Sequence, residues 1–111
     1  MLNILSVNFP FLDNPQQSKL RPGLALTKPL GKHKIIIIAY ITTQLDDVLP
    51  SNISLDLHDE ELPTTGLTQP SVIMLHKLAG VVEERIKGQL GILPQRYEAE
   101  VLAKLRQLFH L

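Results

Sequence analysis

Short apolar runs, separated by polar or proline-containing stretches, dominate most of the chain. The longest run covers residues 35–43, where four consecutive isoleucines begin a segment that ends in two threonines. Fully burying one isoleucine stabilises a fold by about 1.5–3 kcal/mol, and β-branched side chains of this kind favour a strand over a helix. We therefore expect residues 35–43 to form a central strand that is covered on both faces.

Five further segments have the character of strands. Each is short, rich in apolar or β-branched residues, and bounded by turn-forming residues such as proline, glycine, asparagine and aspartate. One of them, residues 53–57, alternates cleanly between apolar and polar positions, as a half-buried strand does. The six predicted strands cover residues 2–9, 20–27, 35–43, 53–57, 71–78 and 86–92.

The tail of the chain follows a helical period. Pro94 is well placed for the first turn of a helix. Beyond it, apolar residues recur every three or four positions with charged residues between them, at Tyr97, Val101, Leu105 and Leu108. The sequence thus predicts one mainly β domain over residues 1–111. Five to seven short strands would form a small barrel or a strongly curled sheet, with a C-terminal amphipathic helix.

Composition limits the possible chemistry. The chain has 111 residues, 44% hydrophobic and 20% charged, as in an ordinary globular domain. Eleven basic and eleven acidic residues cancel, which counts against a broad basic surface, although a local patch can lie on a neutral protein. The absence of cysteine excludes disulfides, thiolate catalysis and cysteine-ligated zinc. No signal-peptide pattern or membrane-spanning run is evident, so we expect a soluble, cytoplasmic protein.

Arg21, Thr42 and Thr43 are the candidate site residues. Arg21 opens the second predicted strand and the two threonines close the third, so pairing of these strands would bring them to one edge of the sheet. Arginine stays ionised and binds phosphate oxygens in pairs, which suits a phosphodiester. Since side chains alternate along a strand, only one threonine should point into such a site. Gln44 follows and could hydrogen-bond a base edge or a phosphate.

Each of these residues also has an ordinary structural interpretation. An arginine at a strand start is commonly a solvated charge, and threonines commonly serve only as β-formers. The four histidines are scattered without a close pair, and the acidic segment 58–61 is better explained as a solvated loop than as a metal site. No phosphate-binding loop, nucleophile elbow or dinucleotide fingerprint is present. The residues alone support a β-rich domain with one cationic, hydroxyl-bearing edge.

Several segments, taken in order, resemble the PemK/MazF family of toxin ribonucleases. They are Phe9-Pro10-Phe11 with Asp13, residues 19–26, residues 39–43, residues 65–73, and residues 89–93 with the amphipathic tail. The resemblance covers nearly the whole chain and depends on the order and spacing of these segments rather than on one motif. It implies a small Src-homology-three-like β-barrel of the CcdB/PemK/MazF type with a C-terminal helix.

The resemblance also implies an activity. Members of this family are toxins of type II toxin–antitoxin systems that cleave single-stranded mRNA without a metal or cofactor, usually as homodimers restrained by a cognate antitoxin. The family's catalytic arginine falls on Arg21 and its catalytic serine or threonine on Thr42, with Lys19, Thr43 and Gln44 expected to bind substrate. The 2′-hydroxyl of the RNA would attack the adjacent phosphorus while the protein orients the phosphate and stabilises its charge.

Two other functions stay open on the sequence. The related CcdB toxins share the fold but poison DNA gyrase through protein contacts, which would be expected to concentrate on the C-terminal helix. A decayed family member would fold and bind its antitoxin without cleaving RNA. Arg21 together with Thr42 favours the nuclease, because a protein-binding toxin has no need of that pair.

Overall fold

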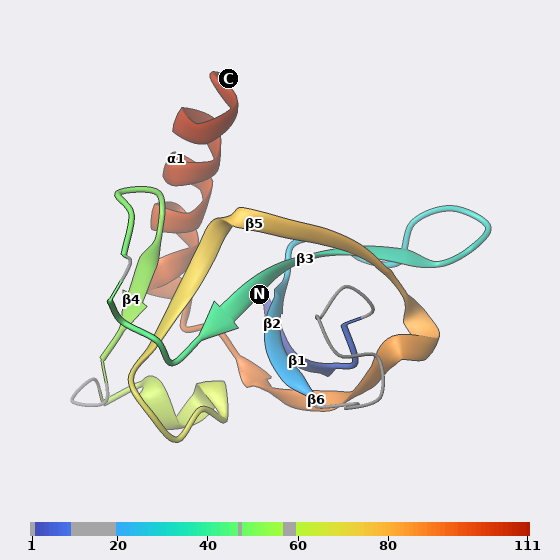
Figure 1. Ribbon diagram of the computed structural model, residues 1–111, viewed down its shortest axis with the longest axis horizontal. Helices are drawn as coiled ribbons and strands as arrows, with labels where there is room; N and C mark the ends of the chain where they lie inside the picture. Colours follow the sequence, from blue (N-terminus) through green and yellow to red (C-terminus); the bar gives the residue numbers. More distant parts are fainter. Residues whose placement is uncertain (1, 10–19, 47, 57–59) are drawn as a thin grey trace.

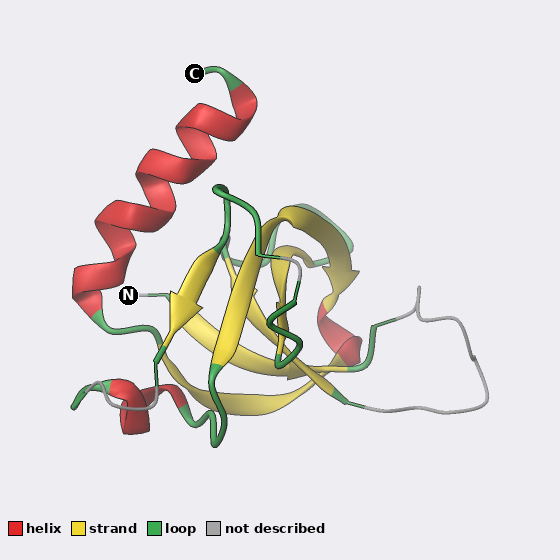
Figure 2. Ribbon diagram, turned by 60° about the vertical axis from the view of Figure 1, so that its left-hand side comes forward, coloured by secondary structure: helices red, strands yellow, loops and turns green. Residues whose placement is uncertain are grey.

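The computed structural model describes residues 2–9, 20–46, 48–56 and 60–111. Within these residues, six strands form one antiparallel sheet, and one α-helix extends from it at the C-terminal end (Figures 1 and 2). The strands are β1 (Asn3–Val7), β2 (Arg21–Ala25), β3 (Ile35–Thr42), β4 (Ile53–Leu55), β5 (Ser71–Val82) and β6 (Ile86–Ile92). The helical elements are α1 (Glu98–Phe109) and three short 3₁₀ turns, η1 (Leu62–Thr65), η2 (Glu83–Arg85) and η3 (Gln95–Tyr97).

The sheet curls nearly into a barrel. Its strand order is β4-β5-β3-β2-β1-β6, and the turn η2 joins β5 directly to β6. Figure 1 looks into the resulting ring, with β5 passing over β3 and β6 closing the opposite side next to β1. The predicted mainly β fold with a strongly curled sheet and a closing helix is therefore confirmed.

Strand β3 is central, as its sequence predicts, and it contributes to two hydrophobic cores. Ile36, Ile38 and Tyr40 belong to one cluster with Val7, Phe9 and Val81, while the alternate residues Ala39 and Ile41 belong to a second cluster with α1. Side chains alternate across the sheet, so one apolar run can supply both faces. This burial explains why nearly every position of the run is apolar.

Helix α1 is anchored mainly by its N-terminal end. Tyr97 and Val101 are buried against the sheet and Leu105 packs against the same core, whereas Leu102 and Phe109 are more than half exposed. The C-terminal half extends beyond the sheet in Figure 2. None of the described helices is both long and apolar enough to span a membrane.

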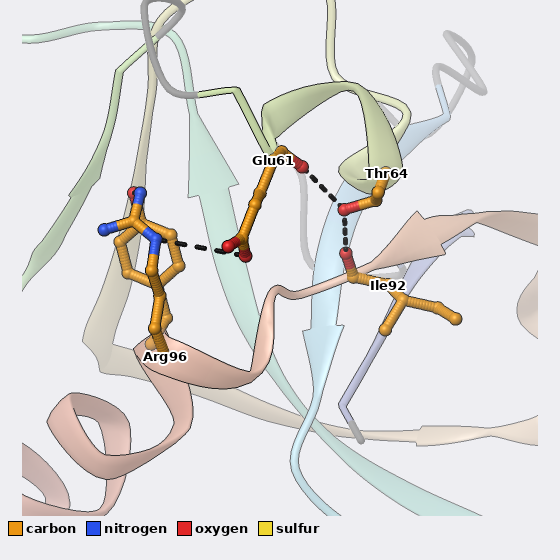
Figure 3. A network of polar contacts seen from close by, with 5 residues as sticks. Glu61, Thr64, Ile92 and Arg96 are labelled. Carbon is orange, nitrogen blue, oxygen red and sulfur yellow. Dashed lines mark hydrogen bonds and ion pairs between the residues drawn. The ribbon is translucent and has the colours of Figure 1, made fainter.

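The segment around η1 is held against the end of β6. The Thr64 hydroxyl donates to the Glu61 carbonyl at 2.7 Å and approaches the Ile92 carbonyl at 3.4 Å, while Arg96 lies 4.0 Å from the Glu61 carboxylate (Figure 3). Two glycines permit the close approach, Gly66 at φ 74° and Gly91, whose backbone faces Thr64. η1 is thus packed against the sheet, with its residues Leu62 and Thr65 buried.

The observed bounds of β1, β2 and β3 lie within two residues of the predicted ones, and the largest difference is in β5. β5 continues to Val82 rather than ending near Leu78, because its second half pairs with the first half of β3. The described part of β4 covers three residues, and residues 57–59 lie outside the described part of the chain.

Candidate functional site

Arg21 and Thr42 meet at the mouth of the curled sheet. Gly23 pairs with Tyr40 in the antiparallel β2–β3 ladder, and continuing that register by two residues places Arg21 opposite Thr42. The side chains of residues two apart share a face, so both lie on the face that carries Gly23 and Tyr40. Arg21 is also paired with Val7 of β1, which fixes its backbone from the other side. The predicted convergence of these two residues is confirmed.

Both residues line a pocket of about 300 Å³. Its walls combine charged, hydroxyl, amide and aromatic groups, contributed by Arg21, Pro22, Tyr40, Ile41, Thr42, Thr43, Gln44, Met74 and Lys77. The only charged members of this set are cationic. A concave site with two cations and no acidic lining residue among the described residues suits an anionic ligand.

Thr43 and Gln44 reach the same pocket as Thr42. All five residues from 40 to 44 line the pocket, so the expectation that only one threonine side chain points into it stays a prediction. β3 ends at Thr42, so the strict alternation of a strand no longer applies to the bend that follows. The fifth predicted site residue, Lys19, lies outside the described part of the chain.

The Thr42 hydroxyl is oriented by the backbone. Its Oγ1 accepts a hydrogen bond from the Gln44 N–H at 3.1 Å, a local turn of the kind that threonine forms at strand ends. Accepting this bond leaves the hydroxyl proton of Thr42 available to donate. The hydroxyl can therefore act as a positioned donor toward an anionic oxygen in the pocket.

The Arg21 side chain is exposed, and within the described residues no carboxylate forms an ion pair with it. A guanidinium stays protonated in proteins and presents its donors in a planar fork. Its charge is thus available to a ligand rather than neutralised by a neighbour. Pro22, which is tolerated here near the start of β2, also lines the pocket and restricts the backbone beside it.

Tyr40 lines the pocket and is backed by the buried ring of Phe9. The ring centroids of Phe9 and Tyr40 lie 4.0 Å apart with an interplanar angle of 29°, and Lys77 Nζ lies 4.6 Å from the centroid of Tyr40. Burial raises the pKa of the Tyr40 hydroxyl above its ordinary value of 10.0. The phenol is therefore neutral at physiological pH, and it is not a ready general base.

Among the described residues, no histidine and no acidic residue lines this pocket. In the part of the chain that the structure describes, no group of three metal-ligating side chains could hold an ion. His76 instead contacts Asn52, with its Nδ1 3.0 Å from Asn52 Nδ2. Residues 58 and 59 of the acidic segment considered above are outside the described chain.

Comparison with known proteins identifies the family and agrees with the fold. The model of the family described as "PemK-like, MazF-like toxin of type II toxin-antitoxin system" matches residues 2–109. Among solved structures, the Mycobacterium tuberculosis toxin MazF-mt6 is similar, with a TM-score of 0.75 and 23% identity over 98% of this chain and 97% of that one. At that identity the likeness shows a common fold. A search of curated proteins gave no match.

Proposed function

Because the chain belongs to the PemK-like, MazF-like toxins of type II toxin–antitoxin systems, we propose that it is an endoribonuclease that cleaves single-stranded mRNA without a metal. The observation that carries this proposal is the meeting of Arg21 and Thr42 in one pocket whose charged lining residues are both cationic. A phosphodiester is the anionic group that needs such donors. Family membership itself implies a cognate antitoxin as partner.

In the proposed reaction the RNA supplies its own nucleophile. The 2′-hydroxyl oxygen attacks the adjacent phosphorus as the bond from phosphorus to the 5′-oxygen breaks. The 2′-hydroxyl gives up its proton and the leaving oxygen takes one up, so the products are a 2′,3′-cyclic phosphate and a free 5′-hydroxyl. Holding the nucleophile in line and stabilising charge on the phosphoryl oxygens are the tasks left to the protein.

Arg21 and Thr42 divide these tasks. The planar fork of Arg21 binds the two non-bridging oxygens, and its charge matters most as negative charge accumulates on them. The Thr42 hydroxyl, held by the Gln44 N–H at 3.1 Å, donates to one phosphoryl oxygen and fixes the orientation of the group. Thr43 and the Gln44 side chain contact the flanking nucleotide, and Lys19 is assigned to the RNA backbone by family resemblance.

We further propose that the toxin is a cytoplasmic homodimer. A two-fold dimer is the commonest way for a small domain to cover surplus apolar surface. Exposed apolar side chains of this kind lie along the C-terminal part of the chain, where Leu102 is 61%, Phe109 54% and Leu111 90% exposed. Light scattering of the purified chain would measure its mass in solution and so test the proposed dimer.

The test is RNA cleavage in excess chelator by the wild type, Arg21→Ala and Thr42→Val. Losing one preorganised donor to developing charge costs about 2.7–4 kcal/mol, so Arg21→Ala should reduce the rate roughly a hundred- to a thousandfold. Losing a hydrogen bond to a charged group costs about 1.5–3 kcal/mol, so Thr42→Val should be roughly ten- to a hundredfold slower. Arg106→Ala, which removes an exposed arginine from α1, should cleave like the wild type.

The outcomes separate the alternatives. Cleavage that yields 5′-hydroxyl ends and depends on both residues supports the ribonuclease. Equal rates for Arg21→Ala and wild type would remove Arg21 from the mechanism. No cleavage by a folded wild type would favour a protein-binding poison acting through α1, or a toxin that has lost catalysis.

A further inference from the structure

Strand β5 is interrupted by a pronounced bulge beside the pocket. Ala39 of β3 pairs with Leu78, but the next residue, Tyr40, pairs with Met74, so residues 75–77 have no partner in β3. The strand bends over this region in Figure 1. Bulges commonly occur beside active sites, where they redirect a side chain that regular pairing would place elsewhere.

The three bulged residues have different surroundings. Leu75 is fully buried in the core cluster that includes Val101 of α1, and His76 Nδ1 lies 3.0 Å from Asn52 Nδ2. Lys77 lies over the ring of Tyr40, with Nζ 4.6 Å from its centroid, and lines the pocket with Arg21. The bulge therefore brings a second cation to the pocket from a strand that does not pair with the one carrying Arg21.

The surroundings of Lys77 are those of a side chain that binds a ligand rather than one that stabilises the fold. Its side chain is exposed, and within the described residues no carboxylate forms an ion pair with it. The Tyr40 ring, itself stacked on Phe9, holds the ammonium group by a cation–π contact at the pocket that Arg21 also lines. Two unpaired cations beside one pocket repel each other, and an anion between them relieves that repulsion.

We propose that Lys77 is a second phosphate-binding residue of this pocket, contacting the RNA phosphate next to the one held by Arg21 and Thr42. The inference builds on the proposed ribonuclease function and adds a residue to it. An ammonium group is a compact charge with three donors, which suits a single phosphate without fixing its orientation. Lys77 thus strengthens RNA binding, while Arg21 and Thr42 act on the phosphate that reacts.

The test compares Lys77→Met, Lys77→Arg and the control Lys87→Met with the wild type. Methionine retains much of the contact with Tyr40 and removes the charge, arginine retains the charge, and Lys87 is an exposed lysine of β6 that does not line the pocket. KM and kcat would be measured in chelator on a short single-stranded RNA carrying a mapped cleavage site. Affinity for the same RNA with a 2′-deoxy residue at that site would be measured between 50 and about 200 mM salt.

We expect Lys77→Met to raise KM and the dissociation constant about tenfold, with kcat within about twofold of wild type. The slope of log affinity against log salt should fall by about 0.7, as for one lost contact with a single-stranded phosphate. Lys77→Arg should restore both values, and Lys87→Met should match the wild type. The melting temperatures of all variants should agree, which excludes a structural origin of the loss.

Other results would overturn the assignment. If Lys77→Met binds and cleaves like Lys87→Met at every salt concentration, Lys77 does not contact RNA, and the proposed ribonuclease function stands unchanged. If kcat falls while KM and the salt slope do not change, Lys77 acts on the reacting phosphate and not on its neighbour. If the wild type neither binds nor cleaves RNA, the proposed function fails, and the role of Lys77 fails with it.

Discussion

Replacing Gly23 by alanine tests whether the packing under the pocket is as tight as the structure indicates. Gly23 is buried in β2, between Leu5 of β1 and Tyr40 of β3. A Cβ added there would lie less than 3.0 Å from Ile38 Cγ2 and 3.1 Å from Phe9 Cζ. Real Cβ atoms do not approach other atoms as closely as the first of these contacts, so either a side chain or the strand must move.

The cost follows from the surroundings. Ile38 is fully buried and its Cγ2 methyl is attached to a stiff β-branched carbon, so it has little freedom to turn away. Overpacking a tight core by one methyl group costs about 1–3 kcal/mol. For a domain of this size, that change lowers the melting temperature by roughly 4–12 °C. Because Phe9 stacks on Tyr40, the same shift should disturb the wall of the pocket.

Thermal and urea unfolding followed by circular dichroism would measure the effect. Gly88→Ala is the matched control, because it makes the same change in strand β6 at an exposed glycine with no heavy atom within 4 Å of the added Cβ. At such an unstrained site, alanine is neutral or stabilising by up to about 1 kcal/mol. If Gly23→Ala proves as stable as Gly88→Ala, the reasoning about close packing beneath the pocket is refuted.

Two further substitutions probe other parts of the structure. Burial raises the pKa of Tyr40, so in the wild type the hydroxyl ionises in the unfolded chain before it ionises in the folded one, and stability falls as the pH rises above 10.0. Tyr40→Phe should lose less stability over that range, measured by urea unfolding between pH 8 and about 11; parallel pH profiles would contradict this. Gly91→Ala would bring a Cβ against the backbone of Thr64 and Thr65. We therefore expect the free energy of unfolding to fall by about 1–3 kcal/mol and hydrogen exchange in η1 to become faster. Unchanged exchange would show that η1 does not depend on this contact.

The strands were predictable because a strand that is buried on both faces needs a continuous run of apolar residues. The run beginning at Ile35 could only be a covered strand, and residues 86–92 form a strand with the predicted bounds. The Arg21–Thr42 edge was also predictable, since consecutive strands commonly pair and the two residues stand at matching ends. What the local pattern did not contain was the length of β5, which depends on how far its second half pairs with β3.

The position of Lys77 was not predictable for a related reason. Along the chain it follows His76 in a run that looks like one regular strand, and nothing nearby signals a bulge. The three-residue shift between Ala39 and Tyr40 arises from pairing and curvature of the whole sheet, which no short window of sequence specifies. The helix illustrates the opposite case: its period was predicted correctly, yet Leu108, one of the predicted apolar positions, is only half-buried.

A net charge of zero is compatible with RNA binding, because what a bound RNA senses is where the charged side chains lie. Eleven acidic residues balance eleven basic ones over the whole chain, but the described lining of the pocket contains Arg21 and Lys77 and no carboxylate. At physiological ionic strength, screening limits the reach of a surface charge to about 8 Å, so among the described residues these two cations act most directly on a ligand in the pocket. A sheet that gathers residues from positions 21 and 77 into one concavity thus creates a local attraction for phosphate that a whole-chain average conceals.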